Sequence, residues 1–415
     1  MQKKRKVVLN FSSTDNGGAG SAAFNFHKAT RSLYDSYFFT ARKTRKDAKS
    51  FQLLDKFKFK LLSKLIQYMV RLNFYKLDYY FLNFPYMNKK IDIKKIKKFI
   101  KEKKIDSIII HSVPNFLNFK LIYQLKKIFN CKIYFNLYDM QHFTGGCSYS
   151  LGCKQFRFHC DNCEGTNFSI IKKEVKNNLL EKIKYVKKIQ PKIISSSKFE
   201  KLRSENSILF KNCDHFHIPQ GHDKETFYII KDKKFLKKKY NINENNIIFF
   251  GAADTDTYRK GLEFFLRALK INKAIKTTVL TIGHKKNELF KDYEINNFHF
   301  DFVNNFKKLN ELINVCDFTA IPSIDETGPT MYNISMMSGV PCITFDIGDS
   351  FEYTKNGITG YKSKLFDFKD MSKNIKKYYK LSDEKKNQMR INCRNLALNK
   401  FSKSAQKEKL KKLFN

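Results

Sequence analysis

The sequence lacks several features that would place it in a special class of protein. No apolar run approaches the ~18 to 20 residues that a membrane-spanning helix needs. The apolar run after the basic residues at 3–6 is too short for the core of a signal peptide. Internal repeats and low-complexity domains are also missing, and there is no tryptophan. We therefore expect a globular protein located in the cytoplasm.

Acidic residues are scarce relative to basic ones. The chain has 39 Asp and Glu against 80 Lys and Arg, which gives a formal net charge of +41. Such a charge can attract nucleic acid, anionic lipid or phosphorylated substrates. Because lysine is abundant along the whole chain, the charge by itself is weak evidence for nucleic acid, which we regard as an unlikely partner.

The size and the cysteine content narrow the class further. A chain of 415 residues, 42% hydrophobic and 15% aromatic, is long enough for two domains that each bury a core. Its nine cysteines are an odd number in a large chain, which favours a reducing compartment over a disulfide framework.

Strand-like and helix-like segments alternate along the chain, which predicts parallel α/β sheets. Residues 6–12 resemble a first buried strand, and a glycine-rich turn and a helix follow. We predict two doubly wound, Rossmann-like domains that face each other across a cleft. The predicted boundaries are 1–218 for a first domain with a cysteine-rich insertion at 143–166, 219–390 for a second domain, and 391–415 for a helix returning to the first domain.

The stretch at 317–348 resembles a strand, an acidic loop, a helix and a second strand. In open α/β sheets, ligands bind where strands end and helices begin, and the amides at a helix start favour an anion. Asp325 and Glu326 would repel a bare phosphate, but ionised carboxylates accept hydrogen bonds from hydroxyls. A ligand with both anionic and hydroxyl parts, such as a nucleotide sugar, fits this loop. The alternative is an ordinary loop before a buried helix.

Two cations follow another predicted strand. Arg259 and Lys260 lie in a loop between a buried strand and an amphipathic helix, where they can clamp a diphosphate. The alternative is one more basic loop in a basic protein. His284 follows the next strand, so we expect it near the same rim.

The first turn of the chain is rich in glycine. Gly17 and Gly18 would let the backbone approach a ligand closely. Their spacing is not the dinucleotide-binding fingerprint, so we do not predict NAD. A tight turn without a ligand is the alternative.

Four cysteines cluster within seventeen residues as C-x5-C-x6-C-x2-C, namely Cys147, Cys153, Cys160 and Cys163. Four thiols this close can close a tetrahedral zinc site, so we favour structural zinc as a hypothesis. His159 is a substitute ligand, and reduced pairs or incidental thiols are the alternatives.

The segment at 51–84 interleaves lysines with aromatic residues in a mostly helical pattern. Such a segment can lie on an anionic membrane surface. A pair of core helices with a solvated basic face is the alternative, and we favour it slightly.

Together these motifs resemble the retaining glycosyltransferases of family 4, which have the GT-B fold. The acidic loop before the helix and its Gly-x-Pro strand resembles the donor-site signature, and Lys260-Gly261 matches the family's diphosphate-binding Lys-Gly. FTGGC with its cysteines resembles a subgroup associated with bacterial surface polysaccharide synthesis. The resemblance is strongest at 10–30, 136–163, 217–227, 250–269 and 320–361.

The sequence departs from the family pattern at several points. Asn333 and Ile334 stand where the second acid of the donor signature is expected, and Ala252 replaces the usual arginine after the strand glycine. Tyr138 replaces a histidine that faces the donor sugar in similar proteins. Arg259 is our candidate to compensate for the missing arginine.

The resemblance implies that a sugar passes from a nucleotide donor to a hydroxyl of a growing surface glycan or lipid-linked oligosaccharide, with retention of configuration. No cofactor is required for such a transfer. The basic aromatic segment at 51–84 adds a peripheral position at the inner face of the cell membrane as a hypothesis. The alternatives are a degenerate sugar-nucleotide-binding protein, a basic nucleic-acid-binding protein and a sugar-nucleotide epimerase. The candidate catalytic residues are Lys260, Arg259, Asp325, Glu326 and Tyr138. The candidate donor-binding residues are Gly17, Gly18, Gly251, His284, Gly328, Thr330, Met331 and Asn333.

Overall fold

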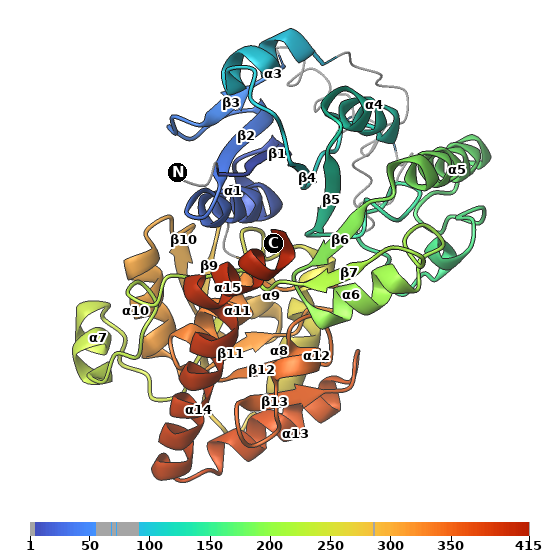
Figure 1. The fold of residues 1–415 in the computed structure, drawn as a ribbon. Coiled ribbons are helices and arrows are strands. Elements are labelled where there is room, and N and C mark those ends of the chain that lie inside the picture. The colour runs from blue at the N-terminus through green and yellow to red at the C-terminus, as the bar shows by residue number, and fades with distance from the viewer. Residues whose placement is uncertain (1–4, 55–67, 69–71, 73–90, 285–286, 415) are drawn as a thin grey trace. The chain divides into compact units, whose positions relative to one another are not determined.

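A computed structural model describes residues 5–54, 68, 72, 91–284 and 287–414. The chain divides into two compact units, Met1–Pro219 with Lys407–Asn415, and Gln220–Gln406. Each unit contains one parallel sheet covered by helices (Figure 1). The predicted class of two doubly wound α/β domains is therefore confirmed.

The sheet of the first unit has seven strands in the order β3-β2-β1-β4-β5-β6-β7, and every pair is parallel. The strands are β1 Val7–Thr14, β2 Asp35–Arg42, β3 Ser50–Gln52, β4 Ser107–Ile110, β5 Lys132–Leu137, β6 Lys192–Ser195 and β7 His215–His217. Most residues of β1, β4 and β5 are buried, because helices cover both faces of a parallel sheet.

Short polar residues cap four α-helices of the first unit, whereas α5 follows Phe168, which supplies no capping side chain. The Asn16 side chain accepts a hydrogen bond from Gly17 at the start of α1, and Asn118 and Ser197 cap α4 and α6 in a similar way. The helical elements are α1 Gly17–Arg31, α3 Ile93–Ile100, α4 Phe119–Phe129, the 3-10 turn η2 Gln155–Arg157, α5 Ser169–Ile189 and α6 Lys198–Glu205.

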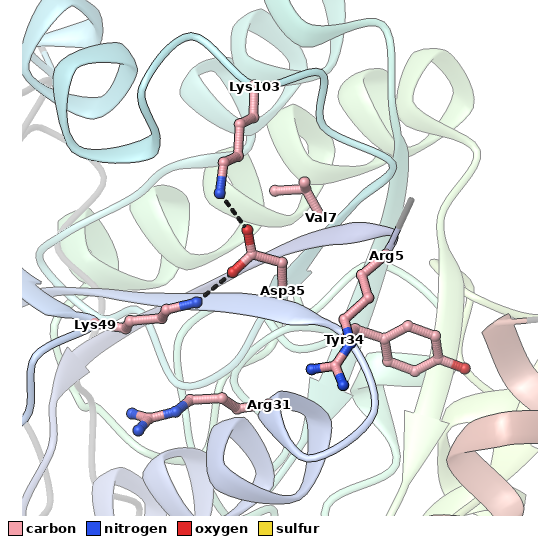
Figure 2. Close-up of a pocket in the computed structure, with 7 residues that line it drawn as sticks. All are labelled: Arg5, Val7, Arg31, Tyr34, Asp35, Lys49 and Lys103. Atoms are coloured by element: carbon pink, nitrogen blue, oxygen red, sulfur yellow. Dashed lines mark hydrogen bonds and ion pairs between the residues drawn. The ribbon is translucent and has the colours of Figure 1, made fainter. Parts of the chain in front are cut away.

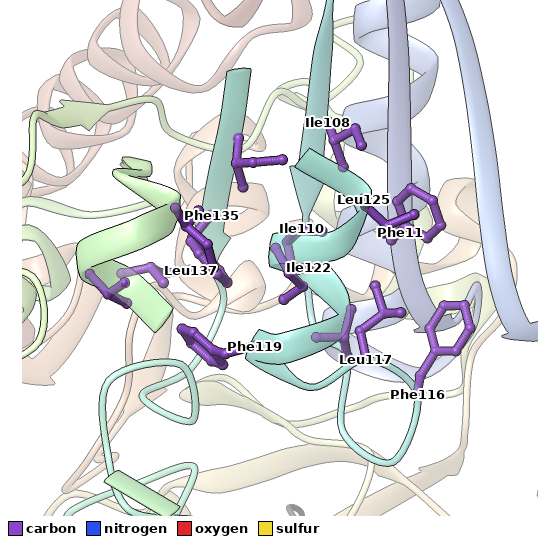
Figure 3. Packing of buried hydrophobic residues seen from close by; sticks show 14 of the residues in the cluster. Phe11, Ile108, Ile110, Phe116, Leu117, Phe119, Ile122, Leu125, Phe135 and Leu137 are labelled. Carbon is purple, nitrogen blue, oxygen red and sulfur yellow. The ribbon is translucent and has the colours of Figure 1, made fainter. Parts of the chain in front are cut away.

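A large apolar core fills the space between the first sheet and its helices (Figure 3). Phe11 of β1, Ile110 of β4 and Phe135 of β5 are fully buried, and Ile122 and Leu125 of α4 pack against the same sheet. Burying a side chain of this size contributes roughly 1.5–3 kcal/mol. This core holds the ends of the central strands in place.

The sheet of the second unit has six parallel strands in the order β10-β9-β8-β11-β12-β13. The strands are β8 Ile247–Gly251, β9 Thr278–Gly283, β10 Asn296–Asp301, β11 Phe318–Ile321, β12 Cys342–Phe345 and β13 Gly360–Ser363. The helical elements are α7 Lys233–Lys239, η3 Tyr258–Lys260, α8 Leu262–Ile271, α9 Leu289–Asp292, α10 Phe306–Val315, α11 Thr330–Met337, α12 Ser350–Tyr353, α13 Phe368–Tyr379 and α14 Asp383–Phe401.

The last helix, α15 Lys403–Phe414, ends in the first unit. The Phe414 ring packs against the rings of Tyr34 and Tyr134, at centroid distances of 5.3 and 5.2 Å. The chain thus passes between the units at 219/220 and again at 406/407.

The basic aromatic segment at 51–84 lies mostly outside the described residues, so the predicted membrane contact is not addressed there. The described start of this segment belongs to strand β3 and not to a helix. Among the helices that the structure describes, none combines the length and the apolar character needed to cross a membrane.

Each sheet reverses its strand order once. In the first unit the reversal lies between β1 and β4, and in the second it lies between β8 and β11. Loops leaving the carboxyl ends of such a strand pair diverge to opposite faces, which opens a crevice for ligands. These two edges are therefore where a site is expected on topology alone.

Candidate functional site

The loops after β8 and β11 are joined at the carboxyl edge of the second sheet. The Ile324 amide donates a hydrogen bond of 2.8 Å to the Arg259 carbonyl. Gly261 has a φ of +68°, and a Cβ there would overlap the Pro322 carbonyl oxygen. Only glycine combines this conformation with so close an approach. The Lys-Gly pair at 260–261 therefore presses the cationic loop against the acidic one.

Three charged side chains meet where these loops touch. One Glu326 carboxylate oxygen accepts hydrogen bonds from the Arg259 guanidinium, at 2.5 Å, and from the Lys260 ammonium. The three side chains keep only 7%, 15% and 22% of their surface exposed, in the order Glu326, Arg259, Lys260. Burial would raise the pKa of Glu326, but the two cations outweigh burial and lower that pKa to about 2. Glu326 is thus an anion held between two cations at neutral pH.

The rest of the acidic loop leads into α11. Asp325 is buried beside Glu326, Gly328 is half-buried, and α11 begins at an exposed Thr330 followed by a half-buried Met331. Pro329 stands at the N-cap and supplies no capping side chain. The loop after β12 packs against this loop, because a Cβ on Gly348 would lie 3.1 Å from the Pro329 ring. The helix start thus lies at the same edge as the cations.

Sequence reasoning missed two acidic residues at this edge, Asp349 and Glu352. Asp349 follows β12, is almost fully buried, and interacts with Asn333, Glu352 and Glu326. Burial raises the pKa of Asp349 well above its usual range, and the Asn333 side chain opposes this rise only in part. Asn333 therefore lies beside a carboxyl group that comes from another strand end. The signal was present as two acids in GDSFEY directly after the predicted strand.

Gly251 and His284 lie at neighbouring strand ends. Gly251 closes β8, where a Cβ would press on the Phe249 ring and the Ile282 side chain, so packing alone accounts for this glycine. The His284 amide donates to the Ala253 carbonyl at 3.0 Å, and the exposed His284 ring stacks on Phe302. The structure therefore places both residues at the predicted rim.

The carboxyl edge of the first sheet carries the predicted glycine turn. Gly17 starts α1 with a φ of +72°, which favours glycine, whereas Gly18 has an ordinary backbone. A Cβ at either position would meet no atom within 4 Å among the described residues. The space beside these two glycines is therefore open.

Tyr138 belongs to a buried polar network under this edge. Its hydroxyl accepts a hydrogen bond of 3.0 Å from the Asn136 amide, and its ring stacks on His111. The His111 Nε2–H donates to the Asn10 amide oxygen at 3.0 Å. Burial raises the pKa of Tyr138 and lowers that of His111 well below its usual range, so both are neutral. Tyr138 can act by hydrogen bonding but is unsuited to moving a proton.

The structure does not assemble the predicted zinc site. Cys147, Cys153, Cys160 and Cys163 are near neighbours, yet nowhere in the described chain are three or more His, Cys, Asp or Glu side chains arranged to hold a metal ion. Burial raises the pKa of Cys147 well above its usual range and that of Cys160 to about 12. Three of the four thiols pack against or within the apolar core.

A buried lysine orders the loop that precedes these cysteines. The Lys182 ammonium on α5 donates to the carbonyl oxygens of Gln141, at 2.6 Å, and Thr144, at 2.8 Å. Burial lowers the pKa of Lys182 to about 8. The FTGGC stretch is therefore held on α5 by hydrogen bonds to its backbone.

The paired doubly wound units are those of the GT-B fold. The structure is similar to sucrose-phosphate synthase from Thermosynechococcus elongatus, with a TM-score of 0.69, 14% sequence identity, and coverage of 99% of this chain and 98% of that one. It is also similar to the Anabaena protein HepE in complex with UDP-glucose, with a TM-score of 0.65, 12% identity, and 99% of both chains covered. At these identities the similarity establishes the fold alone.

Sequence comparison finds a family model and two relatives that match part of the chain. Residues 232–396 match the family described as "Glycosyl transferases group 1". An uncharacterised 41.2 kDa protein in the cps region of Klebsiella pneumoniae is 29% identical over 173 residues, 40% of this chain and 46% of that protein. The UDP-Gal:α-D-GlcNAc-diphosphoundecaprenol α-1,3-galactosyltransferase of Escherichia coli is 27% identical over 213 residues, 48% and 53% of the two chains. The matches thus span about half the length of these relatives.

Proposed function

We propose that this protein is a nucleotide-sugar-dependent glycosyltransferase that transfers a sugar to a hydroxyl of a surface glycan or a lipid-linked oligosaccharide. The observation that carries the proposal is the meeting of Arg259, Lys260 and Glu326 at the strand-order reversal of the second sheet. A site with both anionic and cationic groups suits a ligand that has a diphosphate and several hydroxyls. The match of residues 232–396 to glycosyl transferases supports the same activity.

The hard step in such a transfer is the departure of the nucleoside diphosphate, because negative charge grows on the leaving oxygen. Arg259 and Lys260 come from a loop that Gly261 fixes against the acidic loop. Cations held in place in a partly desolvated site stabilise this charge without reorganising. The backbone amides at Thr330 and Met331 would add the positive end of the helix dipole.

Glu326 has a second role in this proposal. In the structure it accepts hydrogen bonds from both cations, so it occupies the position that a diphosphate would take. When the donor binds, its phosphates replace the carboxylate as partner of the cations. Glu326 and Asp325 can then accept hydrogen bonds from sugar hydroxyls and orient the sugar. Retention of configuration and a role in surface polysaccharide synthesis are finer parts of the proposal. The diphosphoundecaprenol acceptor in the name of the Escherichia coli relative supports a lipid-linked acceptor.

A second candidate is a protein that binds the donor but does not transfer sugar. This candidate is favoured because Asn333 and Ile334 stand where the second acid of the donor signature is expected, and neither side chain is a carboxylate. Ile334 is buried and apolar. Asp349 supplies a buried carboxyl group beside Asn333, and this favours the active enzyme.

The test is a panel of UDP-, GDP- and ADP-sugars, read by donor-induced stabilisation and by slow donor hydrolysis. A ligand that binds only the native state raises the melting temperature. We expect one donor to stabilise the protein and to be hydrolysed slowly. The variant Lys260→Ala should lose both responses, whereas Lys276→Ala, an exposed lysine of the same unit, should keep them.

Stabilisation without hydrolysis, also in the presence of a lipid-linked acceptor, would favour the binding protein. No response to any donor would reject the proposed function. Equal responses in Lys260→Ala and Lys276→Ala would reject the role of the cationic loop.

A further inference from the structure

The first unit has a hollow on the edge of its sheet opposite the glycine turn. This pocket has a volume of about 370 Å³ and is lined by Arg5, Val7, Arg31, Tyr34, Asp35, Lys49 and Lys103 (Figure 2). Its lining residues precede or begin β1 to β4, or end α1. Because all strands are parallel, these residues share the amino edge of the sheet. The pocket is thus separate from the sites considered above, which lie at carboxyl ends.

The charges around this pocket do not cancel. Asp35 accepts hydrogen bonds from both Lys49 and Lys103, which approach its carboxylate from two sides (Figure 2). Arg31 is bound by Asp47, which lies just outside the lining, at 3.0 and 3.1 Å. A third carboxylate, that of Asp106, accepts a hydrogen bond of 2.7 Å from the Val7 amide. The four cations of the lining thus outnumber the three carboxylates bound to lining residues by one.

The ion pairs hold these cations in place. The Asp35 carboxylate keeps only 15% of its surface exposed and also accepts a hydrogen bond from the Tyr37 hydroxyl. Lys103 donates to Asp35 at 2.6 Å and to that same hydroxyl at 3.1 Å. A lysine with two fixed partners keeps a third donor for a ligand. The site is therefore built by the strands rather than by long side chains moving freely in solvent.

We propose that this pocket binds a phosphate group. A phosphate monoester carries about −1.5 to −2 charges at pH 7 and three strong acceptor oxygens, which suit a pocket where cations outnumber carboxylates. Arg5 and Arg31 offer planar guanidinium groups that suit phosphate oxygens, and the lysines act as point charges. The Tyr34 ring lines the pocket beside them and can contact the carrier of the phosphate. The carrier is either a small phosphorylated molecule or the headgroup of a lipid.

The experiment is calorimetric titration of the full chain with inorganic phosphate at constant ionic strength. All variants carry Lys260→Ala, so that the proposed donor site contributes little. Arg5→Gln/Lys103→Gln removes two cations of the pocket and leaves Asp35 paired with Lys49. Lys120→Gln/Lys184→Gln removes two exposed lysines of the same unit, so the change in net charge is the same. We expect the pocket variant to bind phosphate at least tenfold more weakly than the control variant.

A second arm identifies the carrier. Vesicles of phosphatidylcholine with phosphatidylglycerol are compared with vesicles of phosphatidylcholine alone in a sedimentation assay. Binding to anionic vesicles that falls in the pocket variant identifies a lipid headgroup. Binding of phosphate without such a difference identifies a soluble phosphorylated ligand. The proposal is overturned if the pocket and control variants bind phosphate and vesicles equally, or if neither the parent nor the variants bind either.

Discussion

The carboxyl edges of the two sheets differ in the side chains that interact there: ion pairs in one unit and a network of neutral groups in the other. In the second unit, Glu326 is ionised and paired with Arg259 and Lys260. In the first unit, His111, Tyr138, Asn136 and Asn10 form a network in which every group is neutral. Both edges lie at a reversal of strand order. The same topology thus supports a cluster of paired charges in one unit and a neutral hydrogen-bonding network in the other.

The difference shows what each edge is suited to do. Fixed charges at a partly buried edge remain available to a charged ligand, because part of their desolvation cost is already met when the chain folds. A neutral network instead orients backbone and side chains without attracting ions. We therefore propose that the diphosphate binds to the second unit and that Tyr138 has a supporting, hydrogen-bonding role.

Lowering the pH should produce the largest difference in stability between the two edges. His27, His111 and His142 are buried in the first unit, and burial lowers the pKa of His27 to about 4 and that of His142 to about 3. Because the unfolded chain binds these protons near pH 6.5, each histidine costs roughly 1.4 kcal/mol of stability per pH unit below that value. The contribution of Glu326, with a pKa of about 2, is complete above pH ~4.3 and is lost only as the pH falls below that.

We expect strands β1, β4 and β5 to lose more protection between pH 7 and pH 5 than β8 and β11. The second unit also loses some stability, because burial lowers the pKa of its His222 to about 4. Hydrogen exchange with peptide-level mass spectrometry, corrected for the intrinsic rate, measures this. Equal loss in both sets of strands would contradict the contrast.

Removing the charge of Glu326 should change diphosphate binding and sugar transfer in opposite directions. In Glu326→Gln the cations lose their internal partner, so a nucleoside diphosphate no longer competes with a carboxylate. We expect tighter binding of the free diphosphate, together with sugar transfer slowed about 100-fold, since a group that orients the reacting sugar is lost. Calorimetry and a transfer assay measure the two effects.

Glu311→Gln is the matched control, because Glu311 pairs with Lys239 and Tyr240 on another part of the same unit. Weaker diphosphate binding in Glu326→Gln would show that the carboxylate does not compete with the ligand.

Two glycines of positive φ, one at each edge, allow a comparison of packing. Gly261→Ala adds a methyl group against the Pro322 carbonyl and should cost about 3 kcal/mol or more. Gly17→Ala meets open space, so only the backbone conformation is penalised, by about 1–2 kcal/mol. Denaturant unfolding of both variants measures the difference. Similar losses would mean that the loops after β8 and β11 separate easily.

Tyr138→Phe should have the smallest effect. The variant removes the acceptor of the Asn136 amide and should cost about 1 kcal/mol of stability. If Tyr138 acts by hydrogen bonding, transfer slows by less than tenfold and its pH profile keeps its shape. A changed pH profile would instead assign it a proton. Unfolding and pH–rate measurements give both readouts.

Much of the fold could be predicted because periodic apolar runs of strand and helix length alternate along this chain. The same periodicity also predicted that a strand, a loop with Lys260-Gly261 and a helix follow one another. The arrangement of the four cysteines could not be predicted, because spacing says which thiols are near in sequence, not how they are oriented; among the described residues they are not placed to hold a metal ion. Asp349 was missed because nothing in its own stretch shows that it lies beside Asn333.

The sequence by itself determined the elements and the order in which they follow one another, since these depend on local periodicity, glycine and capping residues. Only the tertiary structure decided that Glu326 lies between Arg259 and Lys260, 67 and 66 residues away. The same holds for the neutral state of His111 and Tyr138 and for the cation-lined pocket around Asp35. The physical reason is that pairing and burial of charges depend on which strand ends become neighbours, and this is settled only when the sheets form.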